Sequence, residues 1–73
     1  MECITHTDHD EYHARGIDDD HPIVTARCGT EFDDREAQVT VHESIARAKR
    51  TGKDPCQDCL DKLKGPAADN FAR

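Results

Sequence analysis

Apolar and β-branched residues fall into short groups separated by polar stretches, and two of these groups predict β-strands. β-Branched residues favour a strand over residues 3–7, and a second run of them favours a strand over residues 23–28. Gly29 then ends the second strand with a turn that glycine makes at little cost. Only the polar loop of residues 8–22 separates the two strands, so we predict a β-hairpin with a long tip.

The middle of the chain predicts an amphipathic helix from Asp33 or Asp34 to about Arg50. Asp33 and Glu36 have the spacing of a capping box, and Gly52 is a typical stop signal just beyond the last turn. Apolar residues on one face of this helix are Ala37, Val41, Ile45 and Ala48. The competing interpretation is a strand over residues 38–41, where three successive residues are β-branched. We prefer the helix because both of its ends carry capping chemistry.

Residues 54–66 predict a turn that leads into a short helix, which the final Gly-Pro pair ends. Residues 67–73 predict a flexible C-terminal tail, although Phe71 could fold back onto the core. The predicted organisation is therefore a single domain over residues 1–66 followed by this tail.

The composition leaves little material for a conventional core and indicates a metal instead. Charged residues make up 36% of the chain and its mean hydropathy is -0.93, yet it has four cysteines and five histidines. The N-terminus has no basic stretch followed by an apolar run, and no segment is apolar enough to span a membrane. We therefore expect a cytoplasmic protein whose cysteines stay reduced, which favours zinc over the disulfide framework of a secreted domain.

Cys56 and Cys59 form a C-x2-C pair at the start of the predicted last helix, and Cys28 beside Gly29 resembles half of a zinc knuckle. A redox-active C-x2-C of the thioredoxin type is the alternative, but it normally follows a strand in a βαβ unit, for which the chain is too short. The three cysteines predict a zinc site that needs one more ligand. Four protein ligands would make the Zn²⁺ structural.

The alternation of side chains along a strand suggests His6 as the fourth zinc ligand. His6 shares a strand face with Ile4, and Cys28 shares one with Val24, so both would lie on apolar faces of the hairpin. Cys3 is the alternative, because it would complete an all-cysteine site. His9 and His13 have the spacing of a metalloprotease helix, but no helical pattern surrounds them. We therefore interpret them as solvated, like the acidic run at residues 18–20.

The net charge of -6 divides unevenly along the chain. Residues 1–46 carry twelve acids and three bases, whereas residues 47–73 carry seven bases and four acids. A chain that is acidic overall is a poor general ligand for nucleic acid, so we expect a protein-interaction or regulatory module with a protein partner. The alternative is a nucleic-acid-binding zinc finger that uses basic residues of the second half: Arg47, Lys49, Arg50 and Lys53. We expect no enzyme, because no nucleophile and base remain beside the zinc ligands.

Three motifs together resemble the short zinc-finger-like proteins common in actinobacteria and their bacteriophages: Ile4-Thr5-His6, Thr25-Ala26-Arg27-Cys28-Gly29 and Cys56-Gln57-Asp58-Cys59-Leu60. The resemblance implies zinc ligands at His6, Cys28, Cys56 and Cys59. The C-x2-C at a helix start also resembles the second half of a treble-clef or GATA-type finger. The chain departs from the group in its long acidic loop and in a helix inserted before the C-x2-C. The predicted fold class is thus α+β: a small zinc-stapled, zinc-ribbon-like or treble-clef-like domain made of a β-hairpin, a helix and a zinc knuckle leading into a short helix.

Overall fold

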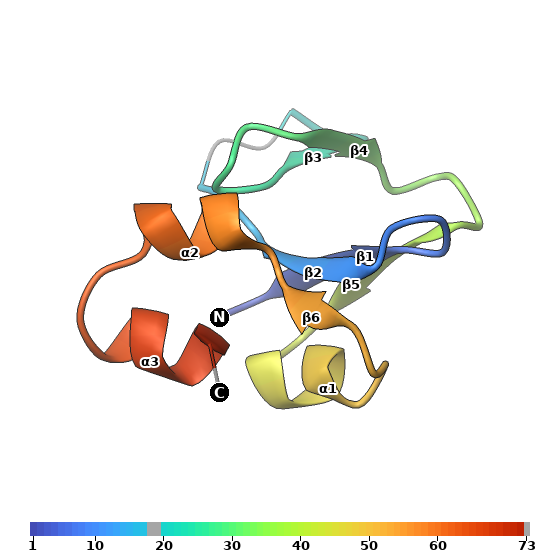
Figure 1. Ribbon diagram of the computed structural model, residues 1–73. Helices are drawn as coiled ribbons and strands as arrows, with labels where there is room; N and C mark the ends of the chain where they lie inside the picture. The colour runs from blue at the N-terminus through green and yellow to red at the C-terminus, as the bar shows by residue number, and fades with distance from the viewer. Residues whose placement is uncertain (18–19, 73) are drawn as a thin grey trace.

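A computed structural model describes residues 1–17 and 20–72 of the chain (Figure 1). Asp18 and Asp19 of the acidic run, and Arg73 of the predicted tail, lie outside the described residues. The elements in chain order are β1 (Cys3–His6), β2 (Glu11–Ala14), β3 (Ile23–Thr25), β4 (Glu31–Asp33), β5 (Val39–His42), α1 (Ile45–Lys49), β6 (Asp54–Pro55), α2 (Gln57–Lys62) and α3 (Pro66–Ala72). This mixture of strands and short helices confirms the predicted α+β class.

The main sheet has four strands in the order β5-β1-β2-β6, so β1 and β2 are central. β1 runs antiparallel to both β2 and β5, and Ile4 lies directly opposite His13 on β2 and Val41 on β5. Successive side chains of β1 point to opposite faces, yet Cys3, Ile4 and Thr5 are all buried. Both faces of the main sheet are therefore covered.

One face of the main sheet is covered by a separate two-stranded sheet of β3 and β4, which lies above it in Figure 1. Val24 and Phe32 are opposite each other in this hairpin and are both buried. Its base joins the end of β2 by close backbone contact, since Gly16 N donates to Thr25 O at 2.7 Å. A Cβ on Gly16 would lie only 2.8 Å from that oxygen, so the junction requires glycine.

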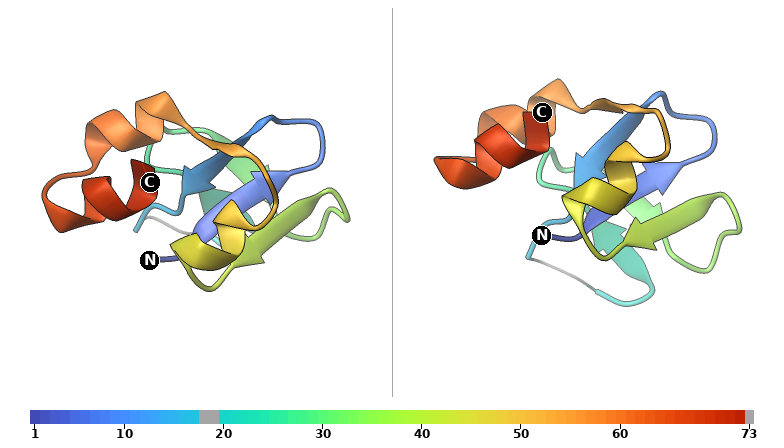
Figure 2. Two further views of the ribbon diagram at one scale, coloured as in Figure 1. Left: turned by 60° about the horizontal axis from the view of Figure 1, so that its bottom comes forward. Right: turned by 90° about the horizontal axis from the view of Figure 1, so that it is seen from below.

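Helices α1 and α3 lie on the opposite side of the main sheet, as Figure 2 shows when this side is turned forward. Ala48 of α1 and Phe71 of α3 are fully buried. The Phe71 ring packs edge-on against Tyr12 of β2 with centroids 4.8 Å apart, and the Tyr12 hydroxyl donates to Phe71 O. Residues 66–72 therefore form a helix in place of the predicted flexible tail, and Phe71 folds back onto the core as the alternative predicted.

The predicted pairing of the two N-terminal strands is also wrong. Residues 3–6 pair with β2, which lies within the predicted loop of residues 8–22, and β3 pairs with β4 instead. In β2 the buried apolar residues Tyr12 and Ala14 alternate with Glu11 and His13, a two-residue period that stabilises a central strand.

The predicted long helix over residues 33–50 is replaced by a turn, β5 and the short α1. The carboxylate of Asp33 accepts a hydrogen bond from Arg35 N and forms a turn, so it does not cap a helix. The β-branched residues form β5, which confirms the competing strand interpretation. Ser44 is the true N-cap of α1, because its hydroxyl accepts from Arg47 N, and Gly52 follows the helix as predicted with a φ of 81°.

The short helix predicted to begin at the C-x2-C is present as α2.

Within the described residues, no helix is long and apolar enough to cross a membrane.

Candidate metal centre

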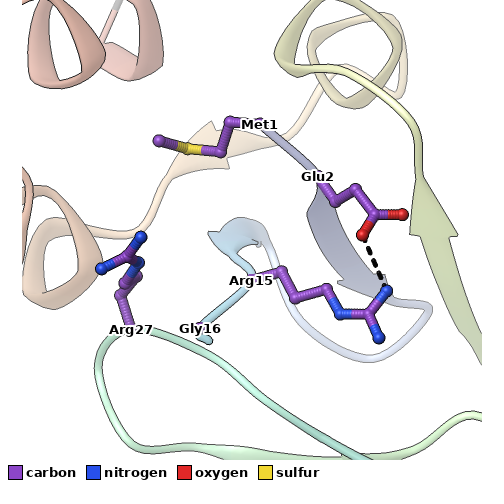
Figure 3. A pocket seen from close by; sticks show the side chains of 5 residues that line it. All are labelled: Met1, Glu2, Arg15, Gly16 and Arg27. Atoms are coloured by element: carbon purple, nitrogen blue, oxygen red, sulfur yellow. Dashed lines mark hydrogen bonds and ion pairs between the residues drawn. The ribbon is translucent and has the colours of Figure 1, made fainter. Parts of the chain in front are cut away.

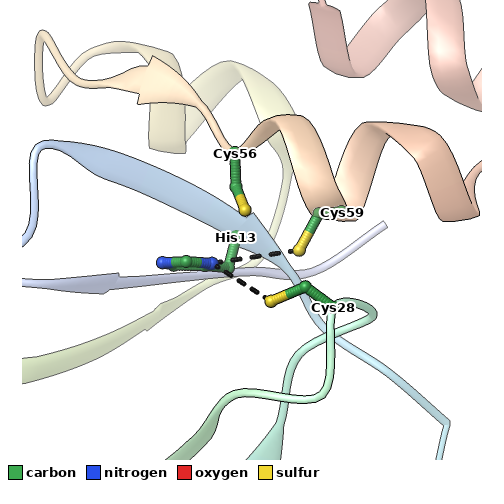
Figure 4. A group of neighbouring side chains, drawn as sticks. All are labelled: His13, Cys28, Cys56 and Cys59. Carbon is green, nitrogen blue, oxygen red and sulfur yellow. Dashed lines mark hydrogen bonds between the residues drawn. The ribbon is translucent and has the colours of Figure 1, made fainter.

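Four side chains that can ligate a metal converge between the two sheets and the start of α2 (Figure 4). They are His13, Cys28, Cys56 and Cys59, and their ligand atoms all lie within 4.8 Å of one another. His13 Nδ1 is 3.7 Å from Cys28 Sγ and 3.9 Å from Cys59 Sγ. None of the four cysteines of the chain forms a disulfide.

Local backbone chemistry explains how each element presents its ligand. Cys28 lies in the β3–β4 turn, where Gly29 has a φ of 95° and its N–H donates to Ala26 O. Cys56 is the extended N-cap of α2, and its N–H donates to Tyr12 O at 3.0 Å. This bond brings the start of α2 alongside the strand that carries His13. Cys59 then follows in the first turn of α2, as the C-x2-C spacing requires.

The spacing of the four atoms fits a tetrahedral zinc ion. Zinc bonds of about 2.3 Å to sulfur and about 2.0 Å to nitrogen place a sulfur and a nitrogen roughly 3.5 Å apart and two sulfurs roughly 3.8 Å apart. The two sulfur–nitrogen distances, 3.7 and 3.9 Å, are within a few tenths of an ångström of the first value. All six spacings are at most 4.8 Å, which is about 1 Å above the sulfur–sulfur value, so these four residues can hold a metal ion after a contraction of that size or less.

Burial changes the pKa of each of the four clustered side chains, and the changes do not all favour the metal-binding form. Burial lowers the pKa of His13, with a further contribution from nearby His9, so the imidazole is neutral and available as a ligand. Burial raises the pKa of Cys56, and it raises the pKa of Cys59 to about 12. For Cys28, burial would raise the pKa, but hydrogen bonds from Thr30 and the neighbouring thiols outweigh it and lower the pKa. A bound divalent cation would stabilise the thiolates that burial alone disfavours.

The far nitrogen of His13 is the least satisfied atom of the site. Nε2 is buried and has no hydrogen-bond partner among the described residues. The ring lies against Phe32 and His9, with centroids 5.2 and 5.8 Å away. Only Nδ1 faces the sulfurs (Figure 4), so a metal would bind the Nδ1 atom and leave the proton on Nε2.

The structure brings together three of the four predicted ligands, Cys28, Cys56 and Cys59, but it joins them to His13 instead of His6. His6 lies on the same sheet face, because it shares that face with Ile4 and Ile4 is directly opposite His13. However, His6 lies two residues beyond Ile4 along β1, which places it about 6.6 Å farther from the cluster along the strand. There its ring stacks on His9 at 4.7 Å and its Nδ1 accepts from Asp8 N.

Cys3, the predicted alternative to His6, lies on the other face of β1. Strand alternation directs its side chain away from the face of Ile4 and His13. It is fully buried, and burial raises the pKa of this thiol to about 11.

The alternation of Tyr12 and Ala14 with polar residues was the one signal in the sequence that could have placed His13 on a strand. That signal was only four residues long, and it lay inside a segment dominated by acids and histidines.

The four basic residues predicted as nucleic-acid contacts lie on or just after α1, at the opposite end of the molecule from β3 and β4 (Figure 1). Arg47 and Arg50 are exposed, and Lys49 is partly buried. The Arg47 guanidinium forms a long ion pair with the Glu43 carboxylate, with 4.0 Å between the nitrogen and the oxygen. The Lys53 ammonium donates to His9 O at 2.6 Å, so it holds the turn between β1 and β2.

A separate open cavity of about 310 Å³ lies between the N-terminus and the end of β2 (Figure 3). Its lining residues are Met1, Glu2, Arg15, Gly16 and Arg27. An ion pair of 2.9 Å joins Arg15 to Glu2 at its wall. The cavity contains none of the four clustered ligands, so the metal centre is a distinct feature.

Comparison with known proteins gives no family to which the chain can be assigned. No protein-family model, curated protein or solved structure matches it. The fold and the four clustered side chains therefore carry the functional argument.

Proposed function

We propose that the chain is a small structural zinc-binding domain that acts as a non-enzymatic protein-interaction module. The observation that carries this proposal is the convergence of three thiols and one imidazole, from three separate parts of the chain, within 4.8 Å. The resemblance to actinobacterial and phage zinc-finger-like proteins remains a prediction, and so does a cytoplasmic location, where a reducing environment would keep the thiols available.

The donor set favours zinc in a structural role. Thiolate and imidazole ligands in tetrahedral geometry suit Zn²⁺ far better than Mg²⁺ or Ca²⁺, which take oxygen ligands. Four protein ligands fill the tetrahedron and leave no position for water or substrate. This closed arrangement supports a non-catalytic role for the ion.

The positions of the ligands indicate what the ion would stabilise. Cys28 lies in the turn that joins the two strands of the small sheet, His13 lies in the main sheet, and the C-x2-C pair lies at the start of α2. Zinc would thus clamp the β3–β4 hairpin and α2 onto the main sheet. A structural zinc site contributes on the order of 10 kcal/mol, which is comparable to the whole stability of a small domain.

The clamped hairpin offers a surface for a basic partner. The exposed acidic residues of the hairpin and its flanks are Asp20, Glu31, Asp34 and Glu36, and they outnumber its two exposed arginines, Arg27 and Arg35, of which Arg35 is already paired with Asp33. Such a surface attracts positively charged protein segments and repels phosphate backbones. The alternative, nucleic-acid binding by α1, has less support because Lys53 is already engaged with His9 O and Arg47 lies beside Glu43.

The zinc proposal is tested by native mass spectrometry followed by thermal unfolding with and without a strong chelator. We expect one zinc ion per chain and loss of the cooperative transition when the ion is removed. A metal-free protein with an unchanged melting curve in chelator would overturn it.

The interaction proposal is tested with two probes on the zinc-loaded protein, a lysine-rich peptide and generic duplex DNA. We expect salt-sensitive binding of the peptide, weakened by the double variant Glu31→Gln/Glu36→Gln and unchanged by Arg47→Gln/Arg50→Gln. Binding of DNA with a steep salt dependence, abolished by the second variant, would favour the nucleic-acid function instead.

A further inference from the structure

Cys28 differs from the other three candidate ligands in its access to solvent. His13, Cys56 and Cys59 are 6%, 4% and 0% exposed, whereas Cys28 in the β3–β4 turn is only partly buried. Figure 4 shows its side chain entering the cluster from this turn, apart from the two cysteines at α2. The turn that carries Cys28 is therefore the most open wall of the cluster, and a small reagent has its shortest path from solvent along it.

The surroundings of Cys28 suit attack on a peroxide. The Thr30 hydroxyl lies 3.2 Å from Cys28 Sγ and is positioned to donate a hydrogen bond at the sulfur or at an oxygen that approaches it. Metal binding keeps a cysteine in its thiolate form, which is the nucleophilic form. The sulfurs of Cys56 and Cys59 lie within 4.8 Å, close enough for one of them to condense with an oxidised Cys28 after a small movement.

From this geometry we propose that Cys28 is an oxidation site through which a hydroperoxide releases the metal, an inference that rests on the proposed zinc centre. The Cys28 thiolate attacks the nearer oxygen of the hydroperoxide and the O–O bond breaks, giving the sulfenic acid and, after protonation, water or an alcohol. The thiolate of Cys56 or Cys59 then attacks the sulfenic sulfur and its S–O bond breaks, so that a disulfide forms and the hydroxide that leaves is protonated to water. Two electrons pass from the two sulfurs to the peroxide, and the ion loses two ligands and dissociates.

Cys3 supplies a control inside the same chain. It is also a reduced cysteine, but it is fully buried on the opposite sheet face and outside the cluster. The same peroxide treatment should therefore leave Cys3 unmodified until the domain unfolds. The Cys3→Ala variant should release zinc at the wild-type rate.

The experiment begins with zinc-loaded protein whose metal content has been measured. A preparation without zinc contradicts the proposed function, whereas a zinc-loaded protein that fails the following steps contradicts this inference alone. Hydrogen peroxide is added with a sulfenic-acid trap, samples are taken from early times, and peptide mapping by mass spectrometry runs in parallel with a colorimetric zinc indicator.

At early times we expect Cys28 to carry the adduct of the sulfenic-acid trap. A disulfide that includes Cys28 should appear later, and zinc should be released with the time course of Cys28 oxidation. Thr30→Val should slow both steps about fivefold, the effect of losing one typical hydrogen bond. Early trapping on Cys56 or Cys59 with Cys28 unmodified would overturn the inference. So would zinc that stays bound after Cys28 is oxidised, or a Thr30→Val variant that reacts as fast as the wild type.

Discussion

Replacement of His13 by alanine should weaken zinc binding strongly, whereas the same replacement of His6 should not. Both are histidines on one face of the main sheet, and their rings both lie near His9 and Phe32. Only His13 directs a nitrogen at the sulfurs, 3.7 and 3.9 Å away. His6→Ala is therefore a matched control for the loss of an imidazole from this face.

The size of the expected effect follows from the number of ligands. Structural zinc sites bind with about 10 to 16 kcal/mol, so one of four ligands contributes on average about 2.5 to 4 kcal/mol. His13→Ala should weaken zinc binding by roughly two to three orders of magnitude. His6→Ala removes a ring that stacks on His9 and one hydrogen bond from Asp8 N, and it should change the Kd by less than about threefold.

The assay is a competition titration of each variant against a chromophoric zinc chelator, with circular dichroism melts of the zinc-loaded and chelated forms. The melts separate loss of a ligand from loss of the fold, because both variants should retain their secondary structure at saturating zinc. Wild-type affinity in His13→Ala, together with weakened binding in His6→Ala, would refute the geometric assignment and restore the ligand set predicted from sequence.

Two further predictions concern the helical side of the main sheet. Phe71→Ala should lower the free energy of unfolding by about 3 to 5 kcal/mol in urea titrations, because it empties a fully buried site against Tyr12, while the exposed Asn70→Ala should have little effect. A loss below about 1 kcal/mol would mean that the C-terminal segment is a loose tail after all. Burial raises the pKa of Cys3 from 9.0 to about 11, so the folded state holds this proton more tightly than the unfolded chain. Stability from this group is complete below pH 9 and is lost as the pH rises towards 11, and zinc-loaded Cys3→Ala should show a smaller alkaline decline in melting temperature than the wild type. Identical alkaline declines in the two proteins would contradict the burial of that thiol.

Features set by a few adjacent residues could be predicted from the sequence. The turn at Gly29 and the helix start at the C-x2-C both depend on local backbone chemistry, and both are present. Three of the four clustered ligands belong to these two motifs. The strand over residues 39–42 was also visible as the competing interpretation, because β-branched side chains favour strands wherever packing permits.

Strand pairing could not be predicted, because it depends on contacts between distant segments. The alternation of side chains along β1 favoured His6 over Cys3 for the face of the site and left Cys3 open as the alternative, but it carried no information on which neighbour lies beside Ile4. Once β2 takes that place, His13 becomes the imidazole nearest the cysteines. The helix prediction failed for a related reason, since Asp33 has the chemistry of both a cap and a turn, and only the pairing of β4 with β3 decides between them.

The two sides of β2 connect the metal centre to the apolar core. His13 faces the cysteines, while the preceding residue, Tyr12, packs on Phe71 and donates to its carbonyl from the opposite face. The backbone of Tyr12 also accepts from Cys56 N, so one residue links the C-terminal helix, the central strand and the start of α2. An ion at the proposed site would hold His13 and the C-x2-C pair together, and its removal would loosen the contact between β2 and the start of α2. For this reason we expect the metal site and the small core to unfold as one cooperative unit rather than as a stable core with a detachable metal loop.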